Sequence, residues 1–184
     1  MQWSLTEPDT LFEPLLQDLP TETSHAHIPP DAMAECLSTQ RKGFAIVGAQ
    51  FGRVAGDGAV ILDTCALRWL AQGGGALSER ALQRIDAAPI VDVSAISGFA
   101  IGIKVRKGKL HLPVPPADWF TAVLTQQHLE VLGLTLEVCL RSTTFPLFHA
   151  DPYDRMIIAA AQVYHLPVVS TDPLCTSYDI EVLA

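Results

Sequence analysis

The amino-acid sequence predicts an α/β protein built on a parallel sheet. The first observation behind this prediction is a set of short apolar runs without polar alternation, such as Ala59–Leu62. Runs of this kind are typical of strands buried on both faces of a sheet. The second observation is that segments with helical periodicity separate the runs, and strands that alternate with helices favour parallel pairing.

The expected strands are residues 59–62, 89–91, 131–134 and 167–170, with residues 180–183 as a candidate fifth. The expected helices are residues 64–71, 77–87, 94–106, 119–128, 136–142 and 154–165. Ser94 is placed to cap the third of these helices. The sequence therefore predicts four to five short strands flanked by helices, in an α/β/α arrangement.

Length and composition exclude several classes of protein. The 184 residues are 49% hydrophobic, which is enough for one domain with a buried core. The net charge of −8 argues against a broad basic surface of the kind that holds duplex DNA. No apolar run approaches the roughly 20 residues of a membrane span, and the acidic start is unlike a secretory signal. We expect a cytoplasmic protein without membrane attachment.

Residues 1–58 differ in composition from the rest of the chain. They carry eight acidic and three basic side chains, a net charge of −5, against −3 for residues 59–184. Five prolines fall within the first thirty residues. A short helix over residues 29–41 and a strand over residues 44–47 are the elements expected there. We predict an N-terminal extension, partly flexible, over residues 1–58 and a folded domain over residues 59–184.

Acidic residues stand where the predicted strands end. Asp63 directly follows the first strand, Asp172 lies just past the strand at residues 167–170, and Asp151 and Asp154 stand at the start of the last long helix. Ligands of open parallel sheets bind at the carboxyl ends of the strands. Clustered carboxylates repel one another unless a cation neutralises them, and oxygen ligands suit Mg²⁺ or Mn²⁺.

Each of these acids also has a purely structural interpretation. Asp151 is suited to cap a helix and Asp154 to interact favourably with the helix dipole. Asp172, followed by a proline, fits a turn. Asp63 is harder to explain in this way, because an acid beside a fully apolar strand is costly without a partner.

From Val60 to the C-terminus the sequence resembles the PIN-domain ribonucleases of the VapC toxin type. The stretches that carry the resemblance are VILDTCALRWLA at 60–71, VSAISGFAIGIKVRKGKLHLPVPP at 93–116, HADPYDRMIIAAAQ at 149–162 and VVSTDPLCTSY at 168–178. The resemblance implies a PIN-like fold and an endoribonuclease dependent on Mg²⁺ (or Mn²⁺). It also implies a type II toxin–antitoxin system, with an RNA substrate, a cognate antitoxin and a homodimer.

The resemblance also implies roles for individual residues. By position, Asp63, Asp154 and Asp172 match the catalytic metal-binding acids of the family, and Asp151 matches a further acid found in a subgroup. Ser94 and Thr171 are candidates for orienting the ligands, with helix capping as the alternative for Ser94.

One position departs from the family pattern. Ala100 stands where these proteins carry a glutamate that contributes to the metal site. Alanine offers no oxygen to a metal, so we expect weaker metal binding and slower chemistry, with water in place of the missing ligand. Asp92, nearby in sequence, is a candidate to compensate.

The densest basic run is Lys104, Arg106, Lys107 and Lys109. It is either a solvated helix end or a strip that contacts RNA phosphates.

Residues 32–58 faintly resemble the helix and strand of a Phd-type antitoxin. Three functions remain open: a toxin ribonuclease that is weakened or inactive, a catalytically dead PIN-like module that binds RNA or an antitoxin, and a phosphotransfer domain acting on small phosphate esters.

Overall fold

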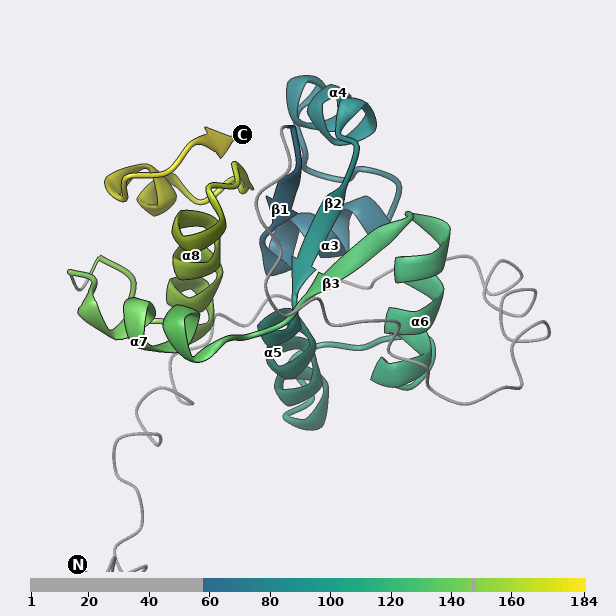
Figure 1. The fold of residues 1–184 in the computed structure, drawn as a ribbon. Coiled ribbons are helices and arrows are strands. Elements are labelled where there is room, and N and C mark those ends of the chain that lie inside the picture. The colour runs from purple at the N-terminus through teal and green to yellow at the C-terminus, as the bar shows by residue number, and fades with distance from the viewer. Residues whose placement is uncertain (1–57, 147) are drawn as a thin grey trace, which may run out of the picture.

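The computed structural model describes residues 58–146 and 148–184 (Figure 1). In this part of the chain five strands form one parallel sheet in the order β3-β2-β1-β4-β5. They are β1 (Val60–Leu62), β2 (Val91–Ser94), β3 (Leu129–Leu132), β4 (Val168–Val169) and β5 (Val182–Leu183). The predicted α/β fold with a parallel sheet is confirmed, and the candidate fifth strand is part of the sheet.

Helices connect the strands. They are α3 (Thr64–Ala71), α4 (Glu79–Ala87), α5 (Ala95–Arg106), α6 (Pro116–Gln126), α7 (Leu136–Thr144) and α8 (Pro152–Tyr164), followed by a short 3-10 helix, η1 (Pro173–Ser177). Figure 1 shows α7 and α8 on one side of the sheet and α6 on the other. The domain is therefore a three-layered α/β/α structure.

Alternating side chains of the strands supply two separate hydrophobic cores. Val60 and Leu62 of β1 face a cluster that includes Leu67 of α3 and the fully buried Trp119 of α6. Ile61 faces the opposite cluster, which includes residues of α7 and α8. Burial of both faces explains why these strands are apolar without alternation.

Helix α5 contributes to both cores. Ile101 belongs to the cluster with α3 and α6, whereas Ile96 and Ala100 belong to the cluster with α8. Because α5 follows directly from the carboxyl end of β2, it lies beside the edge of the sheet where the acidic residues are expected.

Several boundaries differ from the predicted ones, and local backbone explains them. The sequence placed β3 at residues 131–134, but the strand begins at Leu129 because His128, with φ of 52°, ends the preceding connection in the left-handed region. Helix α6 begins at Pro116 rather than at residue 119, since proline fits the first helical position. The predicted bounds of α3 are those observed.

The predicted helix at residues 29–41, the strand at residues 44–47 and the antitoxin-like segment lie outside the described residues, as does nearly all of the proposed extension. In the part of the chain that is described, no helix has the length and apolar character needed to cross a membrane.

Candidate active site

Four acidic side chains gather at the carboxyl edge of the sheet. Asp63 follows β1 and caps α3, whereas Asp172 follows β4 and caps η1. Asp151 caps α8, and Asp154 lies in the first turn of the same helix. Because β1 and β4 are neighbours in the sheet, the acids predicted from distant parts of the sequence come together here.

The charges of these acids interact strongly at Asp154. Burial, followed by the negative charges of Asp151, Asp63 and Asp172, raises the pKa of Asp154 from 3.8 to about 7. Lys104 acts in the opposite direction. A carboxyl group that is half protonated near neutral pH marks a place where negative charge is concentrated without full compensation.

Asp63 is half-buried and well supplied with hydrogen bonds. Burial raises its pKa, while hydrogen bonds from the Ala66 amide, the Ser170 side chain and the Cys65 amide act against this rise. The distance from the Ala66 nitrogen to Asp63 Oδ1 is 2.6 Å. These donors hold the carboxylate in a fixed orientation, as a metal ligand requires.

Ser170, and not the predicted Thr171, links the acids on β1 and β4. The Ser170 hydroxyl is fully buried, bonds Asp63 and accepts a hydrogen bond from the Asp172 amide at 3.0 Å. Thr171 is exposed. The other candidate, Ser94, caps α5 through the Ile96 amide at 3.4 Å, which is the structural role considered for it.

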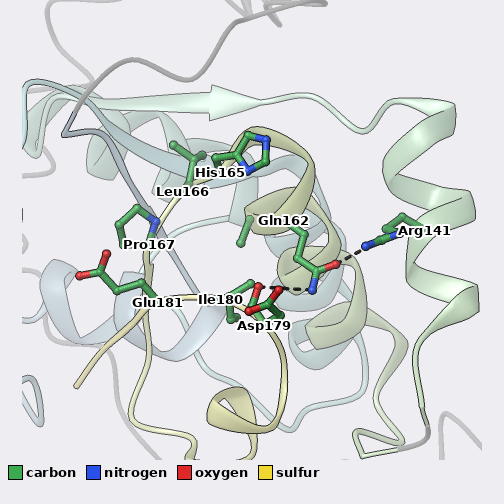
Figure 2. Close-up of a pocket in the computed structure, with 9 residues that line it drawn as sticks. Arg141, Gln162, His165, Leu166, Pro167, Asp179, Ile180 and Glu181 are labelled. Atoms are coloured by element: carbon green, nitrogen blue, oxygen red, sulfur yellow. Dashed lines mark hydrogen bonds between the residues drawn. The ribbon is translucent and has the colours of Figure 1, made fainter.

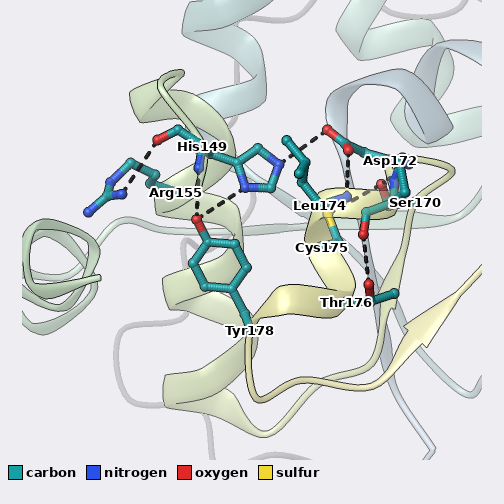
Figure 3. A network of polar contacts seen from close by, with 9 residues as sticks. His149, Arg155, Ser170, Asp172, Leu174, Cys175, Thr176 and Tyr178 are labelled. Atoms are coloured by element: carbon teal, nitrogen blue, oxygen red, sulfur yellow. Dashed lines mark hydrogen bonds and ion pairs between the residues drawn. The ribbon is translucent and has the colours of Figure 1, made fainter. Parts of the chain in front are cut away.

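His149 is a site residue that the sequence reasoning missed. It is 4% exposed, and its Nε2 lies 3.1 Å from Asp172 Oδ2 (Figure 3). Its Nδ1 lies 3.1 Å from the Tyr178 hydroxyl, which also accepts a hydrogen bond from the His149 amide at 3.2 Å. One ligand atom from each of His149, Asp154 and Asp172 can be chosen so that all lie within 4.8 Å of one another.

Arg155 fixes the segment that carries His149. Its buried guanidinium donates to the carbonyls of Ser142, Phe145 and Pro146 at 2.8–3.1 Å, and to that of His149 at 3.5 Å. The group therefore ties the connection between α7 and α8 to the first turn of α8. Each oxygen that it binds is a backbone carbonyl, so Arg155 shapes the site without a direct bond to its acids.

Ala100 lies on the inner side of α5, where it is 2% exposed and packs in the core beside α8. Asp92, the candidate replacement, lies in the middle of β2, in register with Ile61 and Glu130. It precedes by two residues the strand end at which the acids gather, and it is not among the charges that act on Asp154. The structure therefore does not place Asp92 in the cluster.

The basic run divides into two parts. Lys104 lies one helical turn beyond Ala100 on α5, and its charge acts on both Asp151 and Asp154. Arg106 and Lys107 lie at and just after the end of α5 and are exposed, and Lys109 follows them. Lys104 is thus the member of the run that borders the acids.

A cavity of about 350 Å³ lies at the opposite, amino-terminal ends of β4 and β5 (Figure 2). Residues that precede these strands line it, among them His165, Pro167 and Asp179. Arg141 on its wall is bonded to Gln162 at 3.1 Å. The cavity is separate from the acidic cluster, because none of the four acids lines it and they follow the carboxyl ends of the strands.

The acidic cluster fits a divalent cation. Burial raises the pKa of Asp63, Asp151 and Asp154, and repulsion from neighbouring carboxylates adds to the rise at Asp63 and Asp154. The ionised cluster is therefore unfavourable on its own. A cation among these oxygens would offset that repulsion, and carboxylate oxygens suit Mg²⁺ and Mn²⁺.

The fold and the acidic edge of the sheet define a PIN domain. The family model described as "PIN domain" matches residues 60–178, and the chain belongs to this family. Among curated proteins it is similar to Ribonuclease VapC22 of Mycobacterium tuberculosis, with 29% identity over 114 residues, 61% of this chain and 86% of the relative. The predicted resemblance to VapC-type PIN ribonucleases is thereby confirmed. No solved structure was found to match the chain.

Proposed function

We propose that this chain is a metal-dependent endoribonuclease that acts as the toxin of a type II toxin–antitoxin system, with activity weakened by Ala100. The observation that carries the proposal is the convergence of Asp63, Asp154 and Asp172 at one edge of the sheet in a PIN domain. The name of the mycobacterial relative, a ribonuclease of the VapC series, supports the choice of RNA as substrate.

Asp63, Asp154 and Asp172 would hold the metal, Mg²⁺ or Mn²⁺, with Asp151 beside them. When bound, such an ion polarises a phosphate oxygen and lowers the pKa of a water that attacks phosphorus. The chain itself orients the ligands in advance: backbone amides donate to Asp63 at 2.6 Å and to Asp172 at 2.8 Å. Lys104 supplies positive charge at the border of the cluster, where it attracts an RNA phosphate.

Ala100 removes one carboxylate from the set that this family resemblance implies. Its methyl group packs in the core against α8 and offers no oxygen. Loss of one metal ligand of this kind reduces the rate by about 10²–10³-fold, equivalent to roughly 3–4 kcal/mol of transition-state stabilisation. We therefore expect weak cleavage by the chain as it stands.

The test is cleavage of an RNA pool by this chain and by Ala100→Glu, each with Mg²⁺, with Mn²⁺ and with EDTA. We expect cleavage only with metal, and about 10²–10³-fold faster cleavage by the variant. The double variant Ala100→Glu/Asp63→Asn is the matched control and should be inactive. Metal-independent cleavage, or hydrolysis of small phosphate esters instead of RNA, would contradict the proposal.

The second candidate is a module that binds RNA or an antitoxin without cutting. Ala100 is the observation that favours it. If neither chain cuts any RNA but both retain RNA in a binding assay, this interpretation replaces the first. Expression of the chain together with the product of its neighbouring gene tests for an antitoxin. Sedimentation of the purified chain tests for the homodimer. We expect the chain to meet the antitoxin and the RNA in the cytoplasm.

A further inference from the structure

We propose that His149 is a nitrogen ligand of the metal in this site, and that it makes the site favour Mn²⁺ over Mg²⁺. The inference rests on the proposed function only in taking the acidic cluster as the metal site. It assigns to the cluster a ligand that is not an acid and that comes from the connection before α8.

The positions of the ligand atoms carry the first step. His149 Nε2 lies 3.1 Å from Asp172 Oδ2, and a ligand atom of Asp154 completes a group in which all separations are within 4.8 Å. In octahedral coordination with bonds of about 2.1 Å, adjacent ligand atoms are about 3 Å apart and opposite ones about 4.2 Å. One ion can therefore contact all three side chains without a large movement of any of them.

Tyr178 provides the support that a ligating histidine needs. Histidines that bind metals usually donate their second ring N–H to an oxygen, which fixes the tautomer and the ring orientation. The Tyr178 oxygen lies 3.1 Å from Nδ1 and can accept that hydrogen, which leaves the Nε2 lone pair directed toward Asp172 and Asp154. Without metal, the other tautomer lets Nε2–H donate to Asp172.

The imidazole is also held in place before any metal arrives. Its ring stacks on Tyr178, with ring centroids 5.4 Å apart and an interplanar angle of 29°. Arg155 bonds the His149 carbonyl and those of the residues that precede it. A ligand whose orientation is preset in this way loses little conformational freedom on binding.

The chemistry of the ligand sets the preference for the metal. Mg²⁺ favours oxygen ligands and retains its waters. Mn²⁺ also takes carboxylate ligands, but as the weakest binder of the first-row transition series it is the one of the two ions that shares the affinity of that series for nitrogen donors. A neutral nitrogen adds no negative charge to a cluster in which the carboxylates already repel one another. His149 thus supplies a donor to a site in which Ala100 offers none.

The test measures metal binding and needs no RNA cleavage. Mn²⁺ and Mg²⁺ are each titrated into the full chain and into His149→Gln, and pulsed electron paramagnetic resonance of bound Mn²⁺ records coupling to nitrogen. We expect nitrogen coupling in the wild type and none in His149→Gln, with at least a tenfold loss of Mn²⁺ affinity and a much smaller change for Mg²⁺. His165→Asn, an exposed histidine in the left-handed conformation, is the control and should change nothing.

Each outcome decides a separate point. Mn²⁺ bound without nitrogen coupling overturns the assignment of His149 and leaves the proposed nuclease intact, with His149 as a partner of Asp172 only. Absence of binding by either ion contradicts the metal site and the proposed function together. If His149→Gln does not fold, the wild-type spectrum and Tyr178→Phe decide, because the latter keeps the imidazole and should lower Mn²⁺ affinity about 10–100-fold.

Discussion

Replacement of Asp154 by asparagine should make the metal-free protein more stable at alkaline pH while it removes metal binding. Asparagine has nearly the same shape as aspartate but carries no charge. In the wild type, burial and the charges of Asp151, Asp63 and Asp172 raise the pKa of Asp154 to about 7. The folded state therefore binds a proton at Asp154 between pH 3.8 and about 7 that the unfolded chain has released.

The sign and size of the effect follow from this difference. The stability contributed by the protonated Asp154 is complete below pH 3.8 and is lost as the pH rises through 7. Between pH 5 and pH 8 the wild type loses this stability only up to the folded pKa of about 7, which is about two pH units. Each unit is worth about 1.36 kcal/mol, so the loss is roughly 2.7 kcal/mol. Asp154→Asn does not titrate at this position, so its stability relative to the wild type should rise by about that amount.

The assay is urea unfolding in EDTA at pH 5 and pH 8, followed by circular dichroism. Asp86→Asn serves as the control, because this carboxylate is exposed on α4, away from the cluster. A difference between Asp154→Asn and the wild type that is the same at both pH values would refute the reasoning. Loss of Mn²⁺ binding by the variant, measured by calorimetry, confirms that the gain in stability comes from a functional site.

Three further predictions concern other parts of the domain. Arg155→Lys should lower the free energy of unfolding in urea by about 3 kcal/mol, because an ammonium group cannot make all the hydrogen bonds that the guanidinium donates to the carbonyls between α7 and α8. Unchanged stability of this variant would show that these hydrogen bonds contribute nothing. Lys104→Gln should weaken RNA binding in a filter assay, and the slope of the logarithm of affinity against the logarithm of salt concentration should fall by about one, as expected for the loss of one phosphate contact. Arg80→Gln, on the exposed face of α4, is the control and should change neither quantity. Trp119→Ala should destabilise the domain by about 3–5 kcal/mol, because this side chain is fully buried in the core between the sheet and α6; a loss below 1 kcal/mol would contradict that placement.

The sequence predicted those parts of the site that depend on local pattern. An acid directly after a fully apolar run placed Asp63 at the end of a buried strand, and the bounds of α3 followed from it. Asp151 and Asp154 were located in the same way by the start of a long periodic helix. In each case the neighbours along the chain determine the position of the side chain.

His149 and Ser170 were missed because contacts between distant segments define them. Nothing local distinguishes His149 from a histidine in a surface loop; its burial depends on Tyr178, which is reached only after α8 and β4. Ser170 and Thr171 are adjacent residues with hydroxyl groups, and only the direction of β4 decides which of them faces Asp63. The position of His149 two residues before the capping Asp151 therefore has no meaning until the fold brings Asp172 and Tyr178 beside it.

The order of strands in the sheet bears on when the acidic cluster is assembled during synthesis of the chain. β1 lies at the centre and pairs with β2 early along the chain, but its other neighbour, β4, is among the last segments to be made. Asp172, Ser170 and Tyr178 all lie beyond that point. A nascent chain on the ribosome therefore exposes Asp63 long before a complete site exists, and pairing across such a long loop is slow. The acidic cluster that the proposed function assigns to the metal is therefore complete only when translation of the domain is almost finished.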